Sequence, residues 1–129
     1  MITFHKDGTL PIRGEVFVFG SNLSGIHGAG AAKVAREEFG AQLGAGMGLM
    51  GKSYAIPTKD QYIETLPLGQ VMMFVDHFMD FAEAFPQMRF FVTRVGCGFA
   101  GYKDEDIAPL FFGATNCSFA EEWRPYLES

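Results

Sequence analysis

Short apolar runs alternate with longer segments of helical spacing along most of the chain. Two segments repeat apolar residues at intervals of three and four, which predicts helices over residues 28–39 and 66–85. Four runs rich in β-branched and aromatic residues have the length of strands, at residues 15–19, 53–56, 89–93 and 116–119. Alternating strands and helices are typical of a layered α/β fold, and we expect a single domain over residues 1–129.

The ends of the chain and one internal stretch carry weaker signals. A Lys-Asp-Gly turn signal predicts an edge hairpin within residues 1–13. Residues 41–52 contain four glycines, which makes regular structure costly there and favours a loop. Asp104 can cap a short helix that contains Pro109, and residues 120–127 are expected to form a terminal helical turn.

Two glycine-rich segments directly follow predicted strands, at residues 20–32 and 94–102. Because open α/β sheets bind ligands at the carboxyl ends of their strands, we expect the two segments to lie near each other. The first segment runs into a helix, and Gly28 and Gly30 leave backbone amides there free to approach an anion. A pyrophosphate suits this environment.

The first segment matches neither of two common phosphate-binding motifs. It lacks the Lys-Ser or Lys-Thr that ends the motif of P-loop ATPases, and it has no clean dinucleotide fingerprint with its distal acid. Both of those enzyme classes are therefore disfavoured. A tight strand-to-helix turn that binds no ligand is the alternative that the composition leaves open.

The charge of the chain and the spacing of its residues limit the classes of ligand and partner that we expect it to bind. The formal net charge is −5 and no basic face is evident, so nucleic acid is unexpected as a partner except as a carrier of the ligand group. No stretch has the length of a membrane span or of a secretory signal, and we expect a cytoplasmic protein without a membrane partner. Histidines and cysteines lack the spacing of metal ligands, so neither a metal nor another cofactor is expected.

Three segments together resemble the macrodomain family. They are the Asn-bearing glycine-rich loop with its helix, the Tyr-Ala-Ile-Pro-Thr-Lys sequence at residues 54–59, and the loop at residues 93–102. The Arg-hydrophobic-Gly-Cys-Gly-hydrophobic core of the last loop is similar to that of the branch that removes ADP-ribose from glutamate side chains or binds it. The resemblance implies a three-layer α/β fold with a mixed, mostly parallel sheet flanked by helices.

The same resemblance implies a function and a set of ligand contacts. The chain would bind ADP-ribose, a related NAD-derived nucleotide or an ADP-ribosylated substrate, and would hydrolyse an ADP-ribosyl linkage. The alternative is a binding module without catalysis. Asn22 would face the distal ribose, and the full set of expected ligand-binding residues is Gly20, Ser21, Asn22, His27, Gly28, Ala29, Gly30, Thr58, Gly96, Cys97, Gly98, Phe99 and Tyr102.

Lys59, His27 and Asp104 are the candidate catalytic residues. In the glutamate-specific branch a lysine just after the second core strand attacks the ribose carbon, and Lys59 stands at that place. The branch carries an aspartate after the Gly-Cys-Gly-hydrophobic run, where this sequence has Ala100; Asp104 or Asp60 could supply the carboxylate instead. His27 could contact a diphosphate or act as a general base, or it could form a hydrogen bond that orders the loop.

Cys97 and the second long helix leave further alternatives. Cys97 could be a nucleophile, but no histidine or asparagine is tied to it by a motif, and a small residue that lets backbone approach the ligand is the simpler interpretation. Apolar residues on more than one side of the helix over residues 66–85 fit either contact with the sheet or the interface of a homodimer.

Overall fold

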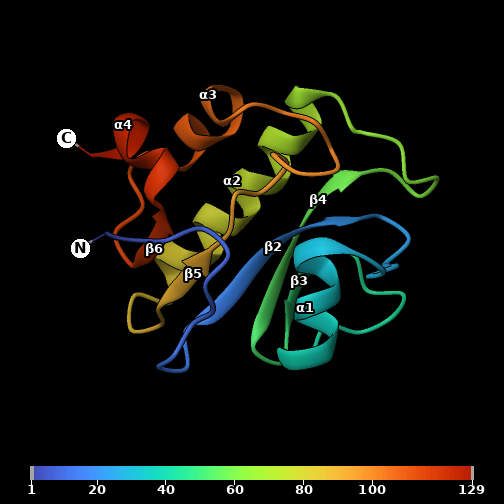
Figure 1. The fold of residues 1–129 in the computed structure, drawn as a ribbon, viewed down its shortest axis with the longest axis horizontal. Helices are drawn as coiled ribbons and strands as arrows, with labels where there is room; N and C mark the ends of the chain where they lie inside the picture. The colour runs from blue at the N-terminus through green and yellow to red at the C-terminus, as the bar shows by residue number, and fades with distance from the viewer. Residues whose placement is uncertain (1, 129) are drawn as a thin grey trace.

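A six-stranded sheet with strand order β1-β6-β5-β2-β4-β3 forms the centre of the molecule (Figure 1). This computed structural model describes residues 2–128. All neighbouring strands pair in parallel except β3, which is antiparallel to β4. The strands are β1 (Thr3–His5), β2 (Val16–Asn22), β3 (Gly48–Met50), β4 (Ser53–Lys59), β5 (Phe90–Val92) and β6 (Cys117–Ala120).

Helices cover both faces of this sheet. They are α1 (Gly30–Glu38), α2 (Leu68–Ala84), α3 (Asp104–Ile107) and α4 (Arg124–Leu127), with short 3-10 turns η1 (Ala108–Phe111) and η2 (Glu121–Trp123). Successive residues of β2 point to opposite faces, as strand geometry requires. Phe17 and Phe19 pack with Ala35 of α1, whereas Val16 and Val18 pack in the cluster that contains α2 and α4. The result is the three-layer, mostly parallel α/β fold that the sequence predicts.

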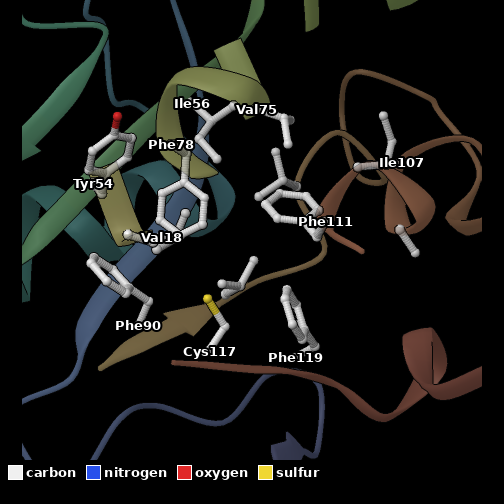
Figure 2. Close-up of a cluster of buried hydrophobic side chains, with 14 of the residues drawn as sticks. Val18, Tyr54, Ile56, Val75, Phe78, Phe90, Ile107, Phe111, Cys117 and Phe119 are labelled. Carbon is white, nitrogen blue, oxygen red and sulfur yellow. The ribbon is translucent and has the colours of Figure 1, made fainter. Parts of the chain in front are cut away.

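The larger of the two hydrophobic clusters is built around Phe78 of α2 (Figure 2). Its fully buried ring lies edge-on to Tyr54, Phe90 and Phe111, at centroid distances of 5.1, 5.2 and 5.9 Å. Such aromatic pairs stabilise a core by more than the burial of their apolar surface alone would.

In residues 2–128 no helix has the length and apolar character needed to cross a bilayer.

The edge hairpin predicted for the N-terminus is wrong. β1 pairs in parallel with β6 at the far end of the chain, with Phe4 opposite Phe119, and residues 9–10 are not a strand. The His5 ring nitrogen Nδ1 lies 2.8 Å from the Ser118 hydroxyl across this pairing. Joining the sheet pairs the backbone groups of β1, which an isolated hairpin would leave partly exposed.

Two strands extend further than their apolar runs indicate, and the loop predicted over residues 41–52 contains the short strand β3. Gly48 and Gly51 have φ angles of +89° and +57°, the region that glycine enters without strain; Gly48 begins β3 and Gly51 lies in the turn into β4. β4 continues through Pro57, opposite Ser21 of β2. Because β3 pairs only with the first part of β4, Pro57 faces no partner on that side that would need its missing N–H.

Candidate functional site

A cleft of about 720 Å³ lies at the carboxyl ends of β1, β5, β2 and β4. A volume of this size accommodates a nucleotide-sized ligand. Its lining combines the N-terminal residues 7–10, both glycine-rich segments and the end of β4. The expected site residues that line it are Gly20, Ser21, Asn22, Gly28, Ala29, Gly30, Thr58, Lys59, Gly96, Cys97, Gly98 and Phe99.

The first wall of the cleft is the loop between β2 and α1, and Asn22 shapes it. The Asn22 amide donates to the Ile26 carbonyl at 2.7 Å, and its side-chain oxygen accepts from the Ile26 amide and the Ser24 hydroxyl at 3.0 and 2.8 Å. Both lone pairs of that oxygen are therefore used within the loop. Asn22 has a local structural role in addition to the expected ribose contact.

The loop ends at the N-terminus of α1, which has no side-chain cap. Ala29 precedes the helix without a capping hydrogen bond, and Gly30 starts it with φ +57°. The first amides of an α-helix have no partner within the helix and carry its positive dipole end. Because Gly28, Ala29 and Gly30 all line the cleft, these amides are free to bind an anion there.

The second wall is the loop after β5. Gly96 has φ +77°, and its amide nitrogen would lie 3.4 Å from a Cβ placed on Gly20 of β2. The positive φ explains glycine at position 96, and the distance shows that β2 and the second wall lie in contact. Burial raises the pKa of the neighbouring Cys97 thiol to about 12, so the thiol is neutral near pH 7 and a poor nucleophile. Cys97 is thus a small lining residue.

Phe99 joins the two walls. Its ring is 75% exposed, yet its edge lies 3.0 Å from the position of a Cβ on Gly30. The Lys59 ammonium lies 5.7 Å from the centroid of the same ring, within the range of a cation–π contact. The ring therefore stands between the start of α1 and the end of β4.

Lys59 lies in the cleft without an acidic partner. Across residues 2–128, no carboxylate forms an ion pair with its ammonium. Asp60 is outside the cleft, where its carboxylate accepts the amides of Tyr62 and Glu64 at 2.8 and 3.0 Å. Asp7 is the one acidic residue among those that line the cleft in the described part of the chain, and it follows β1 at the opposite end.

His27 does not line the cleft, in contrast to its expected role in ligand contact and catalysis. Its side chain is 1% exposed, and Nε2 lies 3.0 and 3.1 Å from the carbonyl oxygens of Gln42 and Ala45. Nε2 must carry the proton to donate to these oxygens, which leaves Nδ1 as an acceptor; Nδ1 is buried without a partner. This geometry matches the loop-ordering alternative, because the imidazole holds the 41–47 loop under the first wall.

Asp104 and Tyr102 also lie outside the cleft. The Asp104 carboxylate accepts two hydrogen bonds from Arg94, at 2.9 and 2.6 Å, and one from the Trp123 indole at 2.7 Å. The Arg94 guanidinium and then the indole hold the pKa of this carboxyl below its usual range, so it stays ionised and cannot supply a proton at neutral pH. The Tyr102 hydroxyl donates to the Leu66 carbonyl.

The β1 end of the cleft contains residues that the sequence interpretation missed. The His5 ring stacks on Phe91 with centroids 3.7 Å apart and planes at 16°, and both residues line the cleft. Burial lowers the pKa of His5, against the opposing effect of Asp7 and three glutamates. The Asp-Gly pair directly after the apolar β1 run was the available signal, but it was assigned to a hairpin turn.

Within residues 2–128, no group of His, Cys, Asp and Glu has a metal-binding arrangement.

Comparison with known proteins identifies the fold. No family model and no curated protein matches the chain. Among solved structures, the macrodomain of Mycobacterium tuberculosis DarG is similar, with a TM-score of 0.69 and 16% identity over 93% of this chain and 97% of that chain. A protein of unknown function from Bacteroides thetaiotaomicron is also similar, with a TM-score of 0.63 and 18% identity over 93% and 96% of the two chains. The chain therefore has a macrodomain-like fold.

Proposed function

We propose that the chain binds ADP-ribose or a closely related NAD-derived nucleotide in this cleft. The observation that carries the proposal is the uncapped N-terminus of α1, flanked by Gly28 and Gly30, facing the loop of Gly96 to Phe99. Helix amides hold a diphosphate without lysine or arginine, which is consistent with a net charge of −5. The similarity of fold to the DarG macrodomain supports the same proposal.

The strand order suggests how such a ligand would lie. β1 is at one edge of the sheet and β4 is beyond β2, so Asp7 and Lys59 are at opposite ends of the cleft. The nucleoside would occupy the β1 end, where the stacked pair of His5 and Phe91 would offer an aromatic face to a base. The Asp7 carboxylate accepts hydrogen bonds only, and it would accept one from the amino group of adenine. The distal ribose would then lie near Asn22 and Lys59.

Calorimetry with ADP-ribose, NAD, AMP and ribose 5-phosphate tests the binding proposal. ADP-ribose is expected to bind more tightly than AMP or ribose 5-phosphate, because each of these fragments reaches only one end of the cleft. Gly28→Val should abolish binding without unfolding the protein, since a Cβ at Gly28 meets no atom within 4 Å and the position lines the cleft. Gly69→Ala, on the exposed side of α2, is the matched control. Binding of none of the four ligands by the wild type would refute the proposal.

Hydrolysis of an ADP-ribosyl linkage through Lys59 is the second part of the proposal. The neutral amine would attack C1″ of the distal ribose, forming a C–N bond as the bond to the acceptor oxygen breaks and the acceptor leaves with the electron pair. Water would then cleave the C–N bond, returning the amine and free ADP-ribose. A carboxylate is the leaving group that best fits this cleft, because it departs as an anion near pH 7 and needs no general acid beside Lys59.

Release of ADP-ribose from a glutamate-linked ADP-ribosylated protein tests this second part. Lys59→Gln should bind ADP-ribose and release none, while Lys33→Gln on α1 should act like the wild type. Equal release by Lys59→Gln would remove Lys59 from the mechanism. Binding without any release by the wild type would instead favour the non-catalytic module. The cytoplasmic location and a homodimer stay predictions.

A further inference from the structure

Arg94 connects Asp7, at the edge of the cleft, to the interior of the protein. Its Nε and Nη2 atoms donate to the two oxygens of Asp104 at 2.9 and 2.6 Å, the paired geometry of a guanidinium on a carboxylate. Its remaining terminal nitrogen, Nη1, donates to Asp7 Oδ2 at 3.2 Å. One arginine therefore joins the N-terminal segment to the start of α3.

The Asp104 end of this connection is firmly held. Asp104 also accepts the indole N–H of Trp123 at 2.7 Å, and Trp123 is fully buried between Phe111 and Phe119. The short double contact and this buried partner fix the guanidinium, so that Nη1 points in a set direction. The Asp7 end is the weaker one, since its contact is single, longer and more exposed.

The Asp7 carboxylate is held by its single contact with Arg94 Nη1. Gly8, the next residue, has φ +85°, and the hydrogen bonds of the following turn are local ones from Thr9 to the Lys6 carbonyl. Among the described residues, Arg94 is the only ion-pair partner of Asp7, and Asp7 Oδ1 has no hydrogen-bond partner. Asp7 is one of the residues that line the cleft. Without Arg94 the carboxylate would be free to turn into solvent.

We propose that Arg94 is a positioning residue that sets the base selectivity of the cleft by holding the Asp7 carboxylate toward the ligand. This inference rests on the proposed function. Arg94 donates one hydrogen bond to Asp7 Oδ2, which leaves Asp7 Oδ1 to accept a hydrogen bond from the amino group of adenine. A base with a keto oxygen at the same place would meet an acceptor instead of a donor, and would be rejected. Selectivity thus depends on Arg94 through Asp7.

The ratio of two dissociation constants tests the inference. Calorimetry compares ADP-ribose with its hypoxanthine analogue, in which a keto oxygen replaces the amino group. The wild type is expected to prefer ADP-ribose by about tenfold, the effect of one hydrogen bond to a charged group. Asp7→Asn and Arg94→Gln should each bring the ratio close to one, and the double variant should show no further change, because the two residues act as a unit.

Arg124→Gln is the matched control. Arg124 also lies between two carboxylates, Glu121 and Glu128, but it does not line the cleft, so the ratio should stay at the wild-type value. If Arg94→Gln does not fold, Arg94→Lys takes its place. A single ammonium cannot reproduce the fork that joins Asp104 and Asp7, so that variant should also lower the ratio.

The outcomes separate this inference from the proposed function. Equal weakening of both ligands by Arg94→Gln, with the ratio unchanged, would make Arg94 a purely structural residue and overturn the inference. A wild-type protein that binds both ligands equally would overturn it as well, while leaving the binding proposal intact. A wild type that binds neither ligand would overturn both.

Discussion

The edge of the Phe99 ring lies 3.0 Å from the position that a Cβ on Gly30 would occupy. Gly30 begins α1 after the first glycine-rich segment, and Phe99 belongs to the loop after β5. The two walls of the cleft therefore meet at this point. A diphosphate held by the amides of α1 would share this space with the Phe99 ring.

Gly30→Ala should lower both the stability of the protein and its affinity for ADP-ribose. An alanine there must adopt φ +57° and push the Phe99 ring, and the backbone strain alone costs about 1 kcal/mol. Urea unfolding measures the first effect and calorimetry the second. Gly28→Ala is the control for stability, because its Cβ meets open space and its φ is not positive. Wild-type stability and affinity in Gly30→Ala would show that the walls do not meet in solution.

His27→Ala should destabilise the protein without acting on the chemical step. The substitution leaves a cavity beside Phe19 and removes the donor to the carbonyls of Gln42 and Ala45, at a cost of about 3 kcal/mol. Denaturant unfolding gives the free energy of unfolding. His77→Ala, at an exposed position on α2, should change it by less than about 0.5 kcal/mol.

The hypothesis that His27 is catalytic predicts the opposite effects on turnover and stability. If His27 were a base in the reaction, its replacement by a residue of similar volume would reduce turnover by orders of magnitude. The free energy of unfolding would stay nearly unchanged. His27→Gln, measured at a temperature where it is fully folded, distinguishes the two roles. Loss of turnover with wild-type stability would restore His27 to the mechanism.

The central elements could be predicted from the sequence because burial leaves a local pattern. In α2, Val71, Val75, Phe78 and Ala82 are buried at the three-and-four spacing that predicts the helix. The edge strands leave no such pattern, since β1 and β3 have three residues each. The partner of β1 lies across the chain, with His5 and Ser118 separated by 113 positions, and local spacing carries no information on such a pairing.

The candidate site was predictable where backbone position decides it. Strand ends followed by glycines placed Gly28 and Gly96 at one edge of the sheet, and both line the cleft. Side-chain direction depends instead on partners that the local sequence does not reveal. His27 turns under the loop toward the carbonyls of residues 42 and 45, and Asp104 turns to Arg94. Their catalytic roles were predicted from residue type alone, which does not determine the direction of a side chain.

Asp104→Asn should lower stability at neutral pH and have less effect in acid. Arg94 and Trp123 hold the pKa of Asp104 below its unfolded value of 3.8. A depressed pKa stabilises the folded state above pH 3.8, and the contribution is lost as the pH falls through the folded pKa. We expect a loss of about 2 kcal/mol at pH 7, since the group is only partly exposed.

The pH series of unfolding free energies for Asp104→Asn and the wild type checks this prediction. The two curves should run parallel above about pH 5 and converge as the pH falls from 3.8 through the lower pKa of the folded protein, where the wild-type carboxyl becomes protonated. Asp80→Asn, on the exposed side of α2, is the control and should follow the wild type throughout. A difference that stays constant into acid would show that the ion pair with Arg94 does not contribute.

Gly46→Ala and Gly48→Ala separate two reasons for glycine where the loop that His27 holds continues into β3. Gly46 has an ordinary φ, but its Cβ would lie 2.1 Å from the Asn22 carbonyl oxygen, a backbone atom at the end of β2. Gly48 has φ +89° and open space around its Cβ. The first substitution must displace backbone, whereas the second requires only local strain of about 1 kcal/mol.

Gly46→Ala should therefore be the more destabilising change, and it alone should weaken ligand binding. Displacement of the Asn22 backbone would disturb the turn that the Asn22 side chain forms with Ile26, and with it the path of the first wall toward α1. Urea unfolding and calorimetry with ADP-ribose on both variants measure the two effects. If Gly48→Ala weakens binding as much as Gly46→Ala, the loop acts on the cleft through β3 and not through its contact with Asn22.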